Sequence, residues 1–113
     1  MAEAELEFEW TLVSYAETSA FVETYGFSGS QNRVNLEGVR IRRRGSTCKT
    51  LAIFMHPATT LQLLPVPRSL AAAGVDVLCG GSRYARNDSA LIMEKVLLDL
   101  GAYIRHAREV WGY

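Results

Sequence analysis

Apolar residues in the first part of the chain recur at a spacing that favours extended structure. They alternate with polar residues over positions 6–12, a period of two that is typical of a half-exposed strand, although a helix is also compatible with this segment. Gly, Ser and Asn residues over positions 26–32 predict a loop. Over positions 34–44, apolar residues are spaced through a polar stretch, which predicts a strand or hairpin. We expect a turn or bulge at Gly38 and an end at residues 45–46.

The second part of the chain has a stronger pattern. Two continuous apolar runs, residues 51–55 and 75–79, predict strands that are buried on both faces. The segment between them has Pro65 and Pro67 near its start, where a helix can dispense with a backbone N–H, and Gly74 just past its end. These features predict a β-α-β unit with a right-handed crossover.

A long helix is predicted over residues 89–111, because six apolar residues follow the 4-3-4-3-4 spacing of one helical face. These residues are Met93, Leu97, Leu100, Ile104, Ala107 and Trp111. Asn87 or Asp88 supplies a cap oxygen at the start, and Gly112 lies where helices commonly end. Basic residues in the final turns, among them His106, oppose the helix dipole.

Together these elements predict an α/β fold, in which a parallel βαβα core over residues 46–113 follows antiparallel strands in residues 1–45. Strand 51–55 would pair with strand 75–79 on one side only. Its other side would be a bare apolar edge, which natural proteins avoid. We therefore expect one incomplete domain, either a fragment or a chain that a partner completes.

Composition and charge narrow the classes of function. Lys and Arg number 12 and so do Asp and Glu, which argues against a broad basic surface for nucleic acid. No apolar run approaches the roughly 20 residues that span a membrane. Two cysteines and two isolated histidines make neither a disulfide framework nor a zinc site. The acidic N-terminus lacks the pattern of a signal peptide, so we expect a cytoplasmic protein with reduced thiols.

The stretch from Arg42 to Tyr113 contains a buried strand that ends in His56-Pro57, a helix that ends in AAAG, the strand VDVLC, the polar loop GGSRYARND and the helix LIMEKVLLDLGAYIRHAREVWGY. It resembles the first half of an α/β-hydrolase of the esterase, lipase and dienelactone-hydrolase group. In that family, the first buried strand ends in a His-Gly type turn whose loop supplies one oxyanion-hole N–H. The strand after the long helix leads into the G-x-S-x-G nucleophile elbow.

The resemblance implies that the full-length relative hydrolyses an ester or similar acyl bond of a small molecule, without a metal or an organic cofactor. The nucleophile, the acid and the His of the triad would all follow residue 113, so this chain alone would be inactive. Its contribution would be scaffolding and the oxyanion loop His56, Pro57, Ala58 and Thr59.

Pro57 departs from the family pattern, because proline has no N–H to donate. The donor would then be the backbone N–H of Ala58 or Thr59, and the ring of His56 would bond to the backbone and hold the loop. The alternative is an ordinary loop between a strand and a helix, with a hydrogen-bonded His.

A triad within this chain is a second, less favoured hypothesis. Ser82 follows a strand, His56 ends the neighbouring strand, and Asp88 would orient that His. The fifth position of the G-x-S-x-G pattern is Tyr84, however, where the tight turn needs Gly. Ser28 also resembles the G-x-S-x-G pattern only in part, since the second Gly, Gly29, comes one position too early. Polar loops are the favoured interpretation of both segments.

Arginines offer two further possibilities. Four of the five residues 40–44 are Arg, which would suit a phosphate, although a strand face turned toward the acidic stretch Glu3–Glu9 is favoured. Arg83 and Arg86 would hold a dinucleotide phosphate only beside a G-x-G-x-x-G turn, and residues 56–61 lack one.

We expect Arg83 and Arg86 instead to bond their own loop or to pair with Asp88 and Glu94. Cys79 is predicted to be a small buried hydrophobe.

Two functions therefore remain. The chain is either the N-terminal part of a serine hydrolase, or a complete, non-catalytic α/β module that associates with a copy of itself or with another protein through the open edge 51–55.

Overall fold

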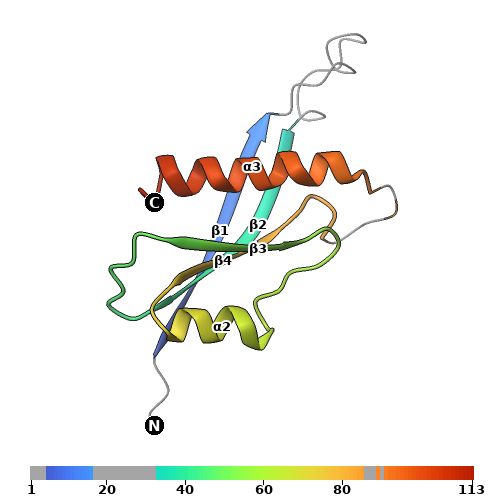
Figure 1. Ribbon diagram of the computed structural model, residues 1–113. Coiled ribbons are helices and arrows are strands. Elements are labelled where there is room, and N and C mark those ends of the chain that lie inside the picture. Colours follow the sequence, from blue (N-terminus) through green and yellow to red (C-terminus); the bar gives the residue numbers. More distant parts are fainter. Residues whose placement is uncertain (1–4, 17–32, 86–88, 90) are drawn as a thin grey trace.

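The computed structural model describes residues 5–16, 33–85, 89 and 91–113, which form a mixed four-stranded sheet with a helix on each face (Figure 1). The strands are β1 (Leu6–Ala16), β2 (Arg33–Arg43), β3 (Leu51–His56) and β4 (Asp76–Gly81), and the helices are α2 (Pro65–Ala72) and α3 (Met93–Glu109). The α/β class is confirmed, and both segments of uncertain pattern in the first part of the chain are strands.

The strand order in the sheet is β1-β2-β4-β3. The pairs β1/β2 and β2/β4 are antiparallel, whereas β3 and β4 run parallel. Within the described residues β3 has β4 as its sole strand neighbour, so the open edge predicted for residues 51–55 is confirmed. The bulge predicted at Gly38 is wrong, because the register passes through Gly38 without interruption, opposite Thr11 on β1 and Gly80 on β4.

Each face of the sheet has its own hydrophobic cluster, and one helix packs on each cluster. The cluster under α3 contains Val13, Val34, Leu36, Leu78, Ala102 and Tyr103. The cluster under α2 contains Val39, Ile41, Ala71, Val77 and Cys79. Complete burial of an aliphatic side chain of this size stabilises the fold by roughly 1.5–3 kcal/mol, so these two clusters hold the layers together.

Helix α2 begins and ends as its sequence predicts. Pro65 is its first residue, and Pro67 packs inside its first turn. Gly74, two residues past the helix, has a φ of +100°, a left-handed conformation that favours glycine. The chain then turns directly into β4, which completes the predicted β-α-β unit.

Helix α3 is shorter than predicted and buries a different face. It begins at Met93, and its N-cap is Ile92, whose side chain accepts no hydrogen bond, so the predicted cap at Asn87 or Asp88 is wrong. Those two residues lie outside the described part of the chain. Gly112 has the positive φ of +79° expected just past the helix end.

The residues of α3 that face the sheet are Val96, Asp99, Ala102, Tyr103 and Ala107. Of the six residues predicted to form the buried stripe, Ala107 alone is fully buried, while Met93, Leu97 and Ile104 are exposed. The helix is therefore rotated so that the predicted stripe lies on its flank.

Candidate functional site

The loop that follows β3 carries the predicted oxyanion residues. The backbone N–H of Ala58 donates to Nδ1 of His56 over 3.1 Å, so the imidazole turns back onto its own loop. The prediction that His56 holds the loop through a backbone hydrogen bond is confirmed. Pro57 has no N–H. Of the two candidate donors Ala58 is thus occupied, and the N–H of exposed Thr59 has no partner among the described residues.

Ser82 ties this loop to the loop that follows β4. Its hydroxyl donates to the carbonyl oxygen of Pro57 over 2.5 Å, and its Oγ accepts from the N–H of Tyr84 over 3.0 Å. Within the described residues Ser82 and His56 share no hydrogen bond, and Asp88 lies outside them. A buried hydroxyl that is engaged on both sides connects two loops, and the described residues do not assemble the Ser82-His56-Asp88 triad.

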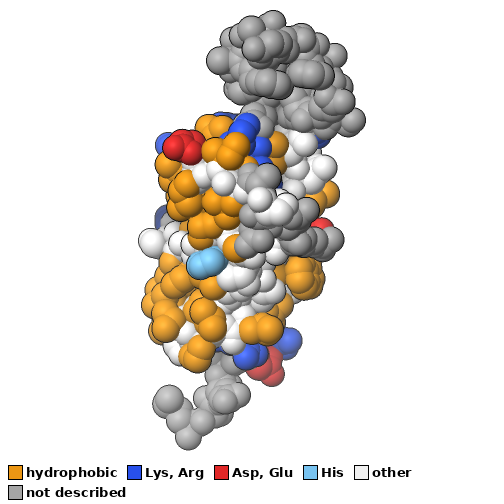
Figure 2. Space-filling model, turned by 90° about the vertical axis from the view of Figure 1, so that its right-hand side faces the viewer, with side chains coloured by type: hydrophobic (Ala, Val, Ile, Leu, Met, Phe, Trp, Pro, Cys, Tyr) orange, Lys and Arg blue, Asp and Glu red, His pale blue; other side chains and the backbone are white. Residues whose placement is uncertain are grey.

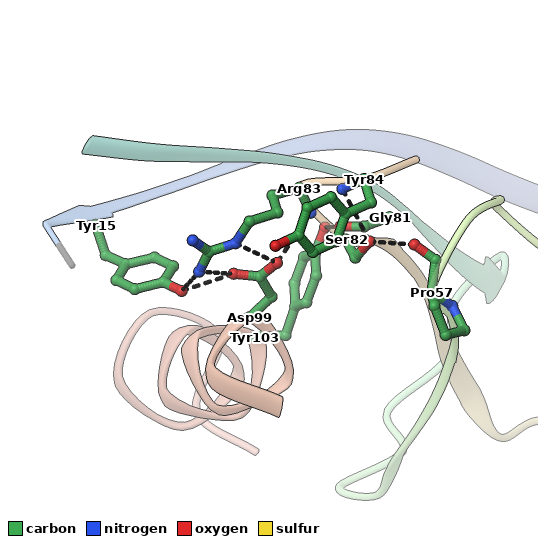
Figure 3. A network of polar contacts seen from close by, with 8 residues as sticks. All are labelled: Tyr15, Pro57, Gly81, Ser82, Arg83, Tyr84, Asp99 and Tyr103. Atoms are coloured by element: carbon green, nitrogen blue, oxygen red, sulfur yellow. Dashed lines mark hydrogen bonds and ion pairs between the residues drawn. The ribbon is translucent and has the colours of Figure 1, made fainter. Parts of the chain in front are cut away.

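A buried ion pair anchors the same loop to α3 (Figure 3). The Arg83 guanidinium donates to both carboxylate oxygens of Asp99, at 2.9 and 3.2 Å, and the backbone N–H of Arg83 donates to the same carboxylate over 2.9 Å. The hydroxyl of Tyr15, on β1, donates to Asp99 over 2.6 Å and accepts from Arg83 over 2.9 Å. Charge-assisted hydrogen bonds of this kind are stronger than neutral ones, so the network fixes the loop to both β1 and α3.

The sequence did not identify Asp99. Arg83 was expected to bond its own loop or to pair with Asp88 and Glu94. Asp88 lies outside the described residues, and among the described ones Arg83 forms an ion pair with Asp99, which was not predicted. The signal was an Asp four residues before Tyr103, a spacing that places both side chains on the same face of the helix. A buried carboxylate needs a cationic partner, and Arg83 was a candidate.

The ring of Tyr103 packs between α3 and the sheet, next to the loop that follows β4. Its ring lies against Gly38 and Gly80, which are paired across β2 and β4, and a Cβ built on Gly80 would lie 2.7 Å from the ring. Its hydroxyl donates to the carbonyl oxygen of Gly81 over 2.7 Å (Figure 3). The carbonyl oxygen of Glu37 lies 3.0 Å from the same hydroxyl. Burial raises the pKa of Tyr103, so the phenol stays neutral and donates at physiological pH.

A pocket of about 330 Å³ lies beside the two loops. It is lined by Trp10, Asn35, Glu37, Gly38, Val39, Thr60, Gln62, Ser82, Arg83 and Ala85. Among the described residues, Oε1 of Gln62 is buried without a hydrogen-bond partner. The lining therefore combines apolar residues such as Trp10 and Val39 with polar residues such as Gln62.

The Arg-rich end of β2 turns toward acidic residues of β1, as favoured from the sequence. The Arg40 guanidinium donates to both carboxylate oxygens of Glu9, at 3.0 and 3.1 Å, and lies 4.1 Å from the ring centroid of Trp111. Arg44 pairs with Glu5 over 2.8 Å. Arg40 is buried, so this part of the strand is a packed face and not a solvated one.

Cys79 behaves as the small buried hydrophobe that was predicted. It is fully buried in the cluster under α2, and burial raises the pKa of its thiol to about 11. A thiol with that pKa is protonated at neutral pH and is a poor nucleophile. Ser28 and Arg86 lie outside the described residues.

The described residues form two hydrogen-bonded loops at the carboxyl ends of two parallel strands, and the main-chain N–H of Thr59 has no partner among those residues. Over the same residues, His, Cys, Asp and Glu side chains nowhere gather in a group of three that could hold a metal ion. None of the helices described has the length and apolarity that crossing a membrane requires. Comparison with protein-family models, with curated proteins and with solved structures found no match.

Proposed function

We propose that the chain forms the first half of a serine hydrolase domain of α/β-hydrolase type, which acts on an ester or similar acyl bond. In this proposal the chain supplies the scaffold and one oxyanion donor, and further sequence supplies the nucleophile, the acid and the catalytic His. The 113-residue chain alone is inactive.

The path of the chain across the sheet supports this division. The connection from β3 through α2 to β4 moves one position away from the open edge, and α3 lies on the opposite face of the sheet from α2 (Figure 1). Crossover connections between parallel strands of one sheet are almost always right-handed. A parallel strand that follows α3 therefore returns in the other direction, past β3, to the open edge.

With such a strand, the direction in which successive strands are added to the sheet would change beside β3. Open α/β sheets bind their ligands at a change of this kind. The crevice lies outside the carboxyl ends of the two strands where the direction of winding changes. One of these strands is β3, and its carboxyl end carries residues 56–59. The loop after the incoming strand, where the family has its nucleophile, would lie directly beside them.

The free N–H of Thr59 is the observation that carries the proposal. His56 occupies the N–H of Ala58, and Ser82 holds the carbonyl of Pro57, so the loop is fixed while the next donor along the chain is left available. A preorganised main-chain N–H is the group that stabilises the oxyanion of acyl transfer, and one such donor is worth about 2.7–4 kcal/mol of transition-state stabilisation.

The transcript beyond the codon for Tyr113, and the longest protein that it encodes, test the proposal. We expect a strand followed by G-x-S-x-G within about 20 residues. We also expect a fluorophosphonate probe to label the longer protein and to leave the 113-residue chain unlabelled. A stop codon directly after Tyr113 contradicts the proposal. So does labelling of the 113-residue chain that the substitution Ser82→Ala abolishes.

Thr59 allows a matched pair of variants in the longer protein. Thr59→Pro removes the N–H and should lower kcat by roughly 10²–10³-fold with little change in KM, because the donor acts on the transition state. Thr59→Ala keeps the N–H and should retain near-normal kcat. Equal kcat values for the two variants, with an unchanged Tm, would show that the N–H of Thr59 does not stabilise the transition state.

A further inference from the structure

Two side chains hold the two ends of a single peptide group in the loop after β3. The Ser82 hydroxyl donates to the carbonyl oxygen of Pro57 over 2.5 Å. The N–H of Ala58 belongs to the same planar group and donates to Nδ1 of His56 over 3.1 Å. The next peptide group carries the N–H of Thr59, and only the two backbone torsions of Ala58 separate it from the held group. The direction of the Thr59 N–H therefore depends on how Ser82 and His56 hold the group before it.

The hydroxyl of Ser82 is itself held by its own turn. Its Oγ accepts from the N–H of Tyr84 over 3.0 Å, and its carbonyl oxygen accepts from the N–H of Ala85 over 3.1 Å. Ser82 is also buried, with 5% of its surface exposed. A serine hydroxyl has one proton, and here that proton goes to Pro57.

A second contact holds the chain on the other side of Thr59. A Cβ built on Gly81, the last residue of β4, would lie 3.1 Å from Cγ2 of Thr60. Thr60 therefore packs over the bare backbone of β4, at the residue before Ser82. Thr59 is exposed between these two points of attachment.

The turn that begins at Ser82 is tied to α3. The backbone N–H and the guanidinium of Arg83 both donate to the carboxylate of Asp99, which is fully buried on that helix (Figure 3). In the proposed hydrolase, the strand that follows α3 carries the nucleophile. The oxyanion loop and the nucleophile would thus be located relative to the same helix.

The end of the sheet at which both loops lie carries few charged side chains. Figure 2 looks onto this end, toward which β3 and β4 point. Of the side chains visible there, hydrophobic and uncharged ones make up most of the middle, and most charged ones lie near the top and the bottom. A main-chain donor acts more strongly on a developing negative charge where the surroundings are less polar, so its direction matters more.

We propose that Ser82 is a positioning residue, which orients the N–H of Thr59 toward the oxyanion by holding the carbonyl group of Pro57. This inference rests on the proposed hydrolase function and adds a residue to it. In this role Ser82 does not contact the substrate, because it acts through the peptide group that it holds.

Two serines with the same hydrogen-bonding pattern allow a matched test in the longer protein. The Ser46 hydroxyl also donates to another segment, to Oδ1 of Asp76 over 2.8 Å, and its Oγ also accepts from the N–H two residues on, that of Cys48. It lies at the opposite end of β4, which begins at Asp76. Ser82→Ala and Ser46→Ala should both lower Tm. Only Ser82→Ala should lower kcat, by roughly 10–10²-fold with KM within about twofold of the wild type, because a misplaced donor weakens transition-state binding.

A double-variant cycle separates positioning from a general loss of structure. Ser82→Ala should lower kcat by less than about twofold in Thr59→Pro, which lacks the N–H, and by the full factor in Thr59→Ala, which keeps it. The same factor in both backgrounds would overturn the proposal, and so would an equal fall of kcat in Ser46→Ala and Ser82→Ala. Complete loss of fluorophosphonate labelling in Ser82→Ala would identify Ser82 as the nucleophile instead.

Nuclear magnetic resonance on the 113-residue chain tests the geometry without the longer protein. Ser82→Ala should shift the amide resonances of Ala58 and Thr59 and lower their order parameters from about 0.85 toward 0.6, whereas Ser46→Ala should change neither. Unchanged amides in Ser82→Ala would overturn the proposal even if the hydrolase function holds. The absence of a nucleophile elbow after Tyr113 is a different failure. It overturns the hydrolase function, and the catalytic role of Ser82 with it, while the amide changes would still occur.

Discussion

Tyr103 can lie flat on the sheet because neither Gly38 nor Gly80 carries a side chain beneath it. The two glycines are opposite each other on neighbouring strands, so together they leave a depression as wide as one aromatic ring. The hydroxyl then reaches two carbonyl oxygens at the end of this depression. In a close-packed interior, even one additional methyl group at such a contact is felt.

Gly80→Ala should therefore destabilise the protein by roughly 1–3 kcal/mol, because its Cβ would lie 2.7 Å from the Tyr103 ring. Gly101→Ala is the control, since a Cβ there meets nothing within 4 Å and α3 would gain up to about 1 kcal/mol of helix propensity. Urea unfolding measures both free energies. A Gly80→Ala variant as stable as the wild type would show that the ring moves freely aside.

At the scale of single residues, local chemistry was predictable and long-range partners were not. The role of His56 follows from its position before Pro57, which leaves a backbone N–H two residues away for the ring to accept. The partner of Arg83 does not follow from the sequence, because Asp99 is 16 residues distant and is brought to it by the packing of α3. The same applies to Ser82, whose acceptor is 25 residues away.

The elements show the same contrast. Strands, the β-α-β unit and the open edge at residues 51–55 were predictable, because each leaves a local pattern of apolar residues and turn glycines. The orientation of α3 was not, because large hydrophobic residues such as Leu97, Leu98 and Ile104 lie on its exposed side, so apolar spacing alone does not identify the buried face.

Asp99 and Tyr103 are both buried on the sheet side of α3. There Arg83 and Tyr15 bind the Asp99 carboxylate. The Tyr103 hydroxyl donates to a main-chain carbonyl oxygen, so both side chains keep polar partners.

Asp99 should then be the residue on which the placement of α3 depends most. Asp99→Asn removes the charge that pairs with Arg83 and should lower the free energy of unfolding by about 3 kcal/mol. That figure is the low end for a buried pair, because the Arg83 side chain is still 16% exposed. Chemical denaturation monitored by circular dichroism measures the change.

The double variant Arg83→Met with Asp99→Asn is the control, because it removes both charges together while the asparagine side chain at position 99 keeps an acceptor oxygen, and it should recover part of the loss. A decrease of less than about 1 kcal/mol in Asp99→Asn would mean that solvent stabilises the Arg83 charge without its partner.

For the whole molecule, the polar anchors lie at both ends of the sheet, with the hydrophobic clusters between them. Arg83 and Asp99 anchor the first half of α3. Near its end, Trp111 packs on Arg40, and the Tyr113 hydroxyl donates to the buried carboxylate of Asp76. The chain that follows α3 is therefore fixed against the beginning of β4.

This second anchor should make stability depend on pH through His106, whose ring meets Trp111 edge-on at 4.8 Å. Burial, with the nearby Arg40 charge, lowers the pKa of His106 below its ordinary value of 6.5, although Glu9 partly opposes this. The folded state then disfavours protonation, so the stability is fully present above pH 6.5 and is lost as the pH falls through the native pKa.

Thermal unfolding between pH 7 and pH 5 should accordingly show a fall in Tm that is smaller in His106→Gln, which does not titrate. An equal fall in both proteins would assign the pH dependence to other groups. The sequence suggested a cationic His106 opposing the helix dipole. The lowered pKa instead favours a neutral ring at pH 7, and its contact is with Trp111.

The paired glycines have a consequence for how the sheet is assembled. The antiparallel strands β1 and β2 join the parallel strands β3 and β4 through the ladder between β2 and β4, which aligns four residue pairs from Gly38–Gly80 to Ile41–Val77. If β2 slipped by one residue, Val39 or Glu37 would replace Gly38 opposite Gly80, and Tyr103 could no longer seat. The Tyr103 ring therefore fits only one register of β2 against β4, and so fixes how the antiparallel and parallel halves of the sheet are joined.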